Sequence, residues 1–579
     1  MLKSWRLARF KSIAAPVEVK LAPLTILCGA NSSGKSSLLQ SMLFLSQSCL
    51  PRASGSPLIL NGVDVRLGTY QDVAHGRTAR TFNVGFDFET QVQETHVTQT
   101  ARARNRLAEP RRYSVLLRTD VSVAPGTGRA DTNLKIDELE FAASSSSGHA
   151  TRLSIKHRRG PSSRFAMPSG GTPSVLGSED FVLRLRSEHE APVDPIEARA
   201  QTSESQLAGV ELQGFVPTAF RYPIDPLLRD LRILINDFLI GAPASYVRST
   251  LTRLQGTQVE EMLIAFMRLP AVVKLIGRRV ESATDSATAF HSLTGAQRGT
   301  LQKLLPAFVA TLPGRDARVI FERQRLPAWL APATQRLLGE LASIKHVGPL
   351  REPPRALHEL SATGDPLDVG DRGQYTAAVL HQNASRKVTY MVDETVQAES
   401  LQVAVDYWLR SLGVHSAART HDLGKLGHQL GIRDEAVSGE LDLTQVGVGV
   451  SQLLPLVVQT LLTPVGGILL LEQPELHLNP AVQSRLADFL ASASRVGKQI
   501  ICETHSEHLV NRLRILAGEG KLAPDEQFRI LFVRRRSGAT TFAPIELDSH
   551  GRIRNWPEGF FDQTLVDAAR LLELDLSSL

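Results

Sequence analysis

The glycine-rich segment 29–36, which reads Gly-Ala-Asn-Ser-Ser-Gly-Lys-Ser, constrains this chain more than any other feature. It matches the phosphate-loop pattern G-x-x-x-x-G-K-[ST]. The apolar run 24–28 before it is typical of a buried strand, and residues 35–48 after it carry apolar side chains at helical spacing. This strand–turn–helix context is the one in which glycines let backbone N–H groups face an anion at a helix start. The sequence therefore predicts an α/β fold with a phosphate-binding turn.

Each polar residue of this turn has an expected role. The Lys35 ammonium would contact the β- and γ-phosphates of a nucleotide, and the Ser36 hydroxyl would bind Mg²⁺. Helix onset at Lys35 would point a positive dipole end at the anion. The expected phosphate-binding residues are Gly29, Asn31, Ser33, Gly34, Lys35, Ser36 and Ser37.

A second group of candidate residues lies more than 400 positions later. Residues 468–472, Ile-Leu-Leu-Leu-Glu, read as an apolar strand that ends in Glu472. We expect this strand beside the phosphate loop, where an acid assists Mg²⁺. Gln473 and Glu475 follow, and the next strand, 498–502, leads into Glu-Thr-His-Ser, where His505 could donate to a γ-phosphate.

A second glycine-rich turn, 447–452, opens a helix just upstream. It has no lysine and is not a second phosphate loop, but the backbone at Gly449 and the Ser451 hydroxyl could bind phosphate. Each feature alone is common in strand ends and loops. Their order raises the specificity: phosphate loop, glycine-rich helix start, acidic strand, histidine strand.

With these motifs the chain resembles the ABC-type ATPase heads of the SMC/RecF class. It is most similar to stand-alone bacterial AAA-family ATPases related to the overcoming-lysogenisation-defect (OLD) family. The tail at 555–562 resembles a C-terminal domain of unassigned function, and 348–354 also looks family-like without an assigned role. The matching segments are 29–36 (Walker A), 447–452 (signature), 468–475 (Walker B), 474–480 (D-loop) and 503–506 (histidine switch).

The resemblance implies ATP and Mg²⁺ as cofactors and a homodimer, with higher oligomers also allowed, in which two heads enclose two ATP molecules. Ser451 of one subunit would reach the γ-phosphate held by Lys35 of the other. Glu472 would act through Mg²⁺, and His505 would sense the γ-phosphate. Gln71 is a candidate Q-loop residue, although an ordinary polar loop glutamine fits its position equally well.

Gln473 departs from the pattern of the resemblance. Its position is held in typical ABC heads by a glutamate that orients or deprotonates the attacking water. Glutamine can hold a water but cannot take its proton. Since phosphoryl transfer relies mostly on positioning and charge, we expect slow turnover with a long-lived ATP-bound dimer. Glu475 could supply a substitute carboxylate.

Patterning divides the chain into four expected parts. Short period-two runs between about 80 and 215 predict an antiparallel sheet, and helical spacing follows over 224–345. The expected fold is an α/β P-loop head of ABC type with an antiparallel β lobe, an inserted helical region and a small C-terminal cap. The expected domains are 1–220, 221–345, 346–515 and 516–579.

Composition favours a cytoplasmic protein without a membrane partner. The three cysteines, Cys28, Cys49 and Cys502, lack metal-ligand spacing and fit a reducing compartment. The longest apolar stretch, 453–471, is broken by prolines and glycines, so no transmembrane helix is expected. No fused nuclease is recognised, because the acids Glu546 and Asp548 have no second acidic strand beside them.

The net charge of +6 and several basic clusters allow contact with DNA or RNA. They equally fit a solvated face, because no stacking aromatics accompany them. The clusters lie at 102–106, 111–112, 156–159 and 534–536.

Three functions fit these observations, in this order. The first is an ATP-dependent switch or motor subunit for a separately encoded effector, with a nuclease favoured, in bacterial defence against phage or foreign DNA. The second is a RecF-like DNA repair or maintenance ATPase. The third is a nucleotide-binding subunit of a transporter, which the long internal insertion disfavours.

Overall fold

The structure is a computed structural model, and it describes most of the 579 residues. It describes 1–50, 58–93, 112–125, 134–157, 174–177, 181–188, 209–213, 215–224, 257–277, 320–327, 329–358, 365–414, 417–433, 439–536, 538–554 and 556–561, together with 293, 294, 297, 300, 301, 304, 308, 567 and 570. The basic cluster 102–106 lies outside these residues.

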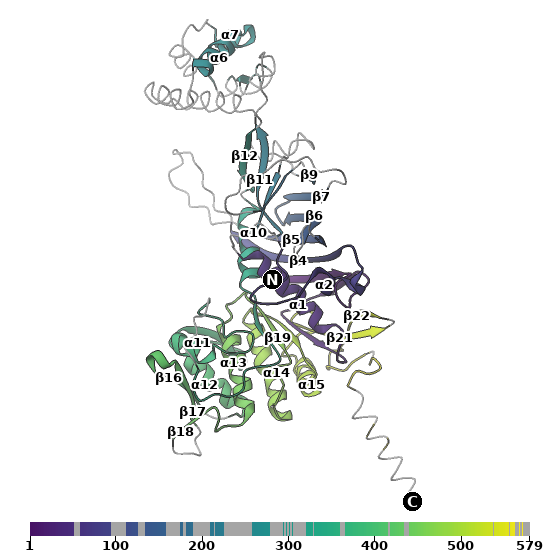
Figure 1. The fold of residues 1–579 in the computed structure, drawn as a ribbon, viewed down its shortest axis with the longest axis vertical. Helices are drawn as coiled ribbons and strands as arrows, with labels where there is room; N and C mark the ends of the chain where they lie inside the picture. Colours follow the sequence, from purple (N-terminus) through teal and green to yellow (C-terminus); the bar gives the residue numbers. More distant parts are fainter. Residues whose placement is uncertain are drawn as a thin grey trace, which may run out of the picture. The chain divides into compact units, whose positions relative to one another are not determined.

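A six-stranded sheet carries the phosphate loop (Figure 1). The strands pair in parallel, except that the last two form an antiparallel hairpin. Strands with both faces covered read as continuous apolar runs, and this explains why 24–28 is buried throughout. In spatial order the strands are β13 Lys345–Val347, β19 Ile468–Glu472, β20 Gln499–Glu503, β3 Leu24–Cys28, β21 Phe528–Arg536 and β22 Ala539–Pro544.

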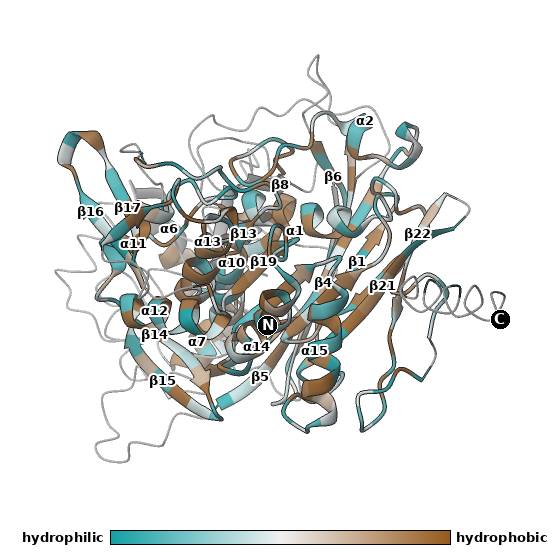
Figure 2. Cartoon of the chain, turned by 90° about the horizontal axis from the view of Figure 1, so that it is seen from below, coloured by the Kyte–Doolittle hydropathy of each residue, from teal (hydrophilic) through white to brown (hydrophobic). Residues whose placement is uncertain are grey.

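Helices pack beside this sheet and share one apolar core with it. Figure 2 shows hydrophobic residues along β19 and β21. Side-chain oxygens of Ser400, Asn479 and Ser506 accept the first free N–H groups of three of these helices, which fixes where each begins. The helices of this core are α11 Thr376–Asn383, α12 Leu401–Leu412, α13 Val448–Leu462, α14 Pro480–Arg495 and α15 Glu507–Gly518. Helix α1 Lys35–Cys49 contacts α10 Ala331–Ala342.

The antiparallel sheet predicted from the period-two runs is confirmed. Its seven strands follow the order β2-β1-β4-β5-β6-β7-β9. The Arg6 guanidinium on β1 ties three strands together, because it donates to Asp87 on β4 and Asp120 on β5. The strands are β1 Leu2–Ala8, β2 Val17–Lys20, β4 Phe82–Gln93, β5 Arg112–Pro125, β6 Leu134–Ser145, β7 Ala150–His157 and β9 Phe181–Glu188.

The structure also contains shorter helices and strands. Figure 2 shows hydrophilic residues along the hairpin of β16 and β17. These elements are α2 Tyr70–Val73, η1 His75–Arg77, β8 Ser174–Gly177, β10 Gly209–Gln213, β14 Lys387–Val392, β15 Thr395–Ser400, β16 Ala417–Asp422, η2 Gly424–Leu426, β17 His428–Arg433 and β18 Glu440–Asp442.

The chain divides into two compact units. The first comprises 1–204, 211–218 and 326–579, and the second comprises 205–210 and 219–325. In the second unit, residues 219–224 of β11 Val216–Ile224 pair antiparallel with β12 Ile320–Arg325. This unit also contains helices α6 Thr257–Met267 and α7 Pro270–Ile276. Within the first unit, β21 and β22 of the 516–579 segment extend the six-stranded sheet. Among the described residues, no helix is long and apolar enough to cross a membrane.

Lys498 is a buried cation at the start of β20. Its ammonium donates to the carbonyls of Thr460 and Leu461 near the end of α13, at 2.9 and 2.8 Å. Burial lowers the pKa of Lys498 from 10.5 to about 7. Since the unfolded chain binds more protons than the folded protein between these two values, stability rises with pH over this window, by at most about 5 kcal/mol from this group.

We expect Lys498→Met to remove most of that rise. The thermal midpoint of the wild type should increase between pH 7 and pH 9.5 more than the midpoint of the variant does. The exposed Lys521, replaced in the same way, is the control. Equal pH slopes in the wild type and Lys498→Met would contradict the assignment.

Candidate phosphate and metal site

The turn between β3 and α1 has a backbone that only glycine adopts at its two ends. Gly29 has φ 139° and Gly34 has φ 109°. A Cβ atom on Gly29 would lie 2.2 Å from the Val533 carbonyl oxygen, and one on Gly34 would lie 2.6 Å from the Thr540 hydroxyl. Thr540 also donates to the Ser33 carbonyl at 2.8 Å. The C-terminal hairpin therefore supports the phosphate loop directly.

Lys35 begins α1 and points back into this turn. Its Nζ donates to the carbonyls of Gly29 and Ala30 at 3.1 and 2.9 Å and lies 3.7 Å from Glu503 Oε1. The Lys35 side chain is 2% exposed, and burial lowers its pKa although Glu503 opposes the shift. Because water screens a buried ammonium only weakly, its hydrogen bonds and ion pairs with a bound anion are strong.

The N-terminus of α1 has no side-chain cap among the described residues, although the Ser37 N–H donates to the Gly34 carbonyl at 3.2 Å. Gly34 is its N-cap and provides no side-chain hydrogen bond, so the first N–H groups of the helix have no capping side chain. The buried Ser33 hydroxyl has no partner among the described residues, while Asn31 is exposed. Ser37 lies 3.5 Å from Ser12, hydroxyl to hydroxyl. This geometry suits a phosphate group.

The position of Glu503 corrects the expected arrangement of strands. Strand β20 lies between β3 and β19, so the strand that ends in Glu472 is not the neighbour of the phosphate loop. The Ser36 hydroxyl donates to Glu503 Oε2 at 2.8 Å. Thus Glu503, rather than Glu472, is the carboxylate that contacts the expected Mg²⁺ ligand Ser36. Glu503 was missed because the sequence shows it only as the first residue of a Thr-His loop.

Glu472 lies one strand further from the loop. It is the register partner of Glu503, and its Oε1 pairs with His346 Nε2 on β13 at 2.9 Å. Burial raises the pKa of Glu503, and the Glu472 and Glu475 carboxylates raise it further. Glu472 and Glu475 therefore add negative charge around Glu503.

Glu475 is buried beside the histidine strand. Its Oε1 accepts the backbone N–H of His505 at 2.6 Å, and its Oε2 has no partner among the described residues. Burial raises the pKa of Glu475 above its usual range. Burial and Lys35 lower the pKa of the His505 imidazole, which favours its neutral form. The structure thus brings Lys35, Glu475, Glu503 and His505 to one place.

Gln473 and Arg351 complete this edge. Gln473 has φ 44°, and its N–H donates to the Glu503 carbonyl at 2.8 Å. The Arg351 guanidinium donates through Nη2 to the carbonyls of Glu472 and Gln473, each at 3.3 Å. Arg351 and His346 were not candidates from sequence, although Arg351 lies in the family-like run 348–354.

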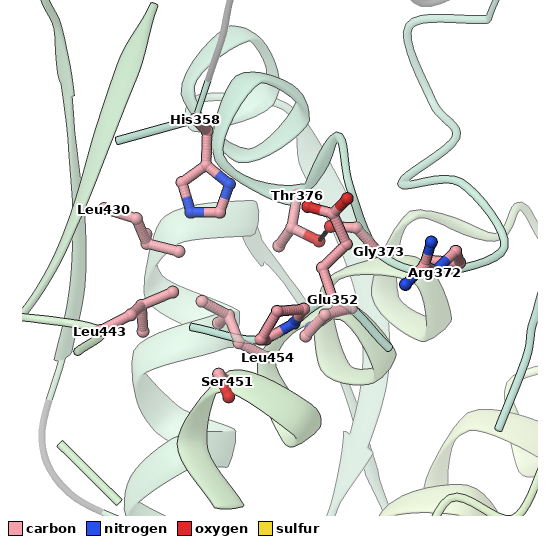
Figure 3. Close-up of a pocket in the computed structure, with 11 residues that line it drawn as sticks. Glu352, His358, Arg372, Gly373, Thr376, Leu430, Leu443, Ser451 and Leu454 are labelled. Carbon is pink, nitrogen blue, oxygen red and sulfur yellow. Dashed lines mark hydrogen bonds between the residues drawn. The ribbon is translucent and has the colours of Figure 1, made fainter. Parts of the chain in front are cut away.

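Other predicted residues are not joined to the phosphate loop by hydrogen bonds within the described part of the chain. The Ser451 hydroxyl donates to Val448 of its own helix at 2.8 Å. Ser451 also lines a pocket with His358, Thr376 and Leu454 (Figure 3). A Cβ atom on Gly449 would lie 3.3 Å from the His477 carbonyl oxygen. Gln71 is exposed on α2, whose Val73 carbonyl accepts the Lys11 N–H.

MgATP fits these residues. The uncapped helix start, buried Lys35 and unpartnered Ser33 hydroxyl suit phosphate oxygens, and the Ser36–Glu503 pair supplies the oxygen ligands that Mg²⁺ prefers. Lys35, Ser36 and Glu503 would hold MgATP, and the metal would neutralise charge on the phosphates.

Two family models match parts of the chain. Residues 360–511 match the family described as "AAA domain, putative AbiEii toxin, Type IV TA system". Residues 524–571 match "Protein of unknown function (DUF3696)", in line with the resemblance of the tail. No curated protein matches the chain.

Solved SMC head domains align with most of the chain. The head of Pyrococcus furiosus Smc, bound to the C-terminal domain of ScpA, has 12% identity, covers 99% of this chain and 98% of its own, and has a TM-score of 0.30. The Thermotoga maritima head has 10% identity, covers 94% and 99%, and has a TM-score of 0.31. Residues 360–511 thus match an AAA-family ATPase domain, and Ser36 of the segment 29–36 donates a hydrogen bond to Glu503 within the matched residues.

Proposed function

We propose that this chain binds MgATP at the site built from both ends of the sequence, hydrolyses it slowly, and dimerises around it. The ATP-bound dimer acts as a switch for a separately encoded effector, with a nuclease favoured, in bacterial defence against phage or foreign DNA. The observation that carries the ATPase part is the contact of Ser36 and Lys35 with Glu503 at an uncapped helix start.

Within the site each residue has a defined task. Lys35 and the N–H groups of the phosphate loop bind the phosphates. Ser36 and Glu503 hold Mg²⁺, and Glu472 adds negative charge one strand away. His505, neutral and beside Lys35, donates to the γ-phosphate. Since Gln473 cannot take a proton from water, Glu475 is the nearest candidate base.

The dimer is proposed from the signature helix α13. Its N-terminus has no side-chain cap, and the Ser451 hydroxyl bonds only within its own helix among the described residues. A second head could therefore place its ATP against Ser451. The switch and defence roles rest on resemblance, supported by the toxin–antitoxin description of the matching AAA family.

ATP turnover by the purified full-length protein, with and without duplex or single-stranded DNA, tests this function. We expect slow turnover that DNA does not change and that Lys35→Ala abolishes. DNA-stimulated turnover with a steep salt dependence would instead support the DNA-maintenance function. Turnover that survives in Lys35→Ala would contradict the assigned site.

Substitutions at Gln473 and Glu475 test the proposed cause of slow turnover. Gln473→Glu restores a carboxylate that can take a proton, so we expect kcat to rise by about 10-fold or more. Glu475→Gln removes the substitute base and is expected to lower kcat by about 100-fold, with little change in KM. An unchanged kcat in Gln473→Glu rules out the slow switch, and an unchanged kcat in Glu475→Gln rules out the substitute base.

A further inference from the structure

The turn 472–477, which follows β19, has an unfavourable backbone. Gln473 has φ 44° and His477 has φ 61°, and neither is a glycine. A non-glycine residue in this region costs about 1–3 kcal/mol and persists only where its surroundings hold it. The turn carries Gln473 and Glu475, so whatever holds it also sets the geometry of the proposed site.

Arg351 contacts the start of this turn through two hydrogen bonds. Its side chain is buried, 5% exposed, and Nη2 donates to the carbonyls of two successive residues, Glu472 and Gln473. Nε and Nη1 have no hydrogen-bond partner among the described residues. Burial lowers the pKa of the guanidinium to about 10, and the Glu475 carboxylate opposes this shift. Burying a guanidinium with unpaired donors costs free energy of folding. Stability alone therefore does not explain why Arg351 lies at this turn.

The loop that carries Arg351 is itself fixed. The Gly348 N–H donates to Asp371 and the Glu352 N–H donates to Arg372, at 2.7 and 2.9 Å. The Glu352 carbonyl accepts from Gln452 Nε2 on the signature helix α13, at 3.4 Å. Arg351 is therefore held from both sides rather than free to follow the turn.

His346 acts on the first residue of the same turn. It lies on β13, which pairs in parallel with β19, and its Nε2 is 2.9 Å from Glu472 Oε1. The two side chains are 14% and 13% exposed. The contact fixes the Oε1 atom of the Glu472 carboxylate.

We propose that Arg351 and His346 are positioning residues that hold the turn 472–477 and the Glu472 carboxylate in their working geometry. The effect on catalysis rests on the proposed ATPase function. The contacts of Arg351 and His346 with the turn, here called the clamp, exist in the protein without nucleotide. Both residues come from 346–351, a segment outside every recognised ATP-binding motif.

Hydrogen–deuterium exchange of peptides spanning 472–478 tests the clamp without nucleotide. In Arg351→Met we expect exchange in this turn to be about 10-fold faster, since each hydrogen bond lost is of ordinary strength. Arg355→Met is the matched control, because Arg355 is on the same loop but is half exposed and lies 3.7 Å from Glu352. Unchanged exchange in Arg351→Met overturns the clamp. If that variant does not fold, Arg351→Lys, which keeps one donor, serves in its place.

Steady-state kinetics test the catalytic meaning. We expect Arg351→Met and His346→Leu to lower kcat by about 10-fold with KM within 2-fold, while His346→Gln, which keeps a donor near Nε2, restores kcat. A rise in KM with unchanged kcat, or equal loss in His346→Gln and His346→Leu, overturns the positioning role. If the wild type shows no turnover, the proposed function fails, and the exchange result still decides the clamp.

Discussion

Replacing Glu503 by glutamine is expected to lower the kcat for ATP by about 100-fold or more, because the substitution removes the carboxylate that we propose as a Mg²⁺ ligand. Glutamine keeps the size of the side chain and can still accept a hydrogen bond from Ser36, so the fold should persist. It cannot balance Lys35 or bind Mg²⁺ as a carboxylate does. The Mg²⁺ concentration needed for half-maximal turnover should rise.

Two comparisons make this result specific. Glu472→Gln should have a smaller effect on the Mg²⁺ requirement, because Glu472 contacts His346 and lies one strand further from Ser36. Glu519→Gln changes an exposed carboxylate that pairs with Lys521 and should have no effect. A Glu503→Gln protein with the Mg²⁺ requirement of the wild type would show that Glu503 is not a metal ligand.

Lys35→Ala is expected to weaken nucleotide binding by about 100-fold and to abolish turnover. The ammonium is almost dry and lies at the start of α1, so its attraction to phosphate is weakly screened. Binding of a fluorescent ATP analogue measures the affinity. Lys11→Ala is the matched control. The Lys11 ammonium donates to Gln40 on α1, the helix that Lys35 begins, but Lys11 lies outside the phosphate loop. Equal affinities for the wild type and Lys35→Ala would place the nucleotide elsewhere.

The parts of the site that are local in sequence were predictable. The apolar strand, the glycine turn and the helix at Lys35 follow from spacing over 25 residues, and the structure has them as β3 and α1. The antiparallel sheet also followed from its period-two runs. In each case neighbouring residues in the chain decide the structure.

The parts that depend on the order of strands were not predictable. A parallel sheet is ordered by its crossovers, and nothing in 468–503 shows that β20 would lie between β3 and β19. The sequence therefore placed Glu503 in a loop, and the acid that assists Mg²⁺ was predicted to be Glu472 instead. Arg351 and His346 reach the site from more than 100 residues away along the chain, so no local pattern could reveal their contacts with Glu472 and Gln473.

We propose that one MgATP is bound by residues far apart in the sequence, namely Lys35, Ser36 and Glu503. Electron paramagnetic resonance of Mn²⁺, a substitute for Mg²⁺, measures this binding directly in the full-length protein with ATP. Tight Mn²⁺ binding should require ATP and should be lost in both Lys35→Ala and Glu503→Gln, but not in Glu519→Gln. ATP-dependent Mn²⁺ binding of equal strength in the wild type and Glu503→Gln would contradict the claim.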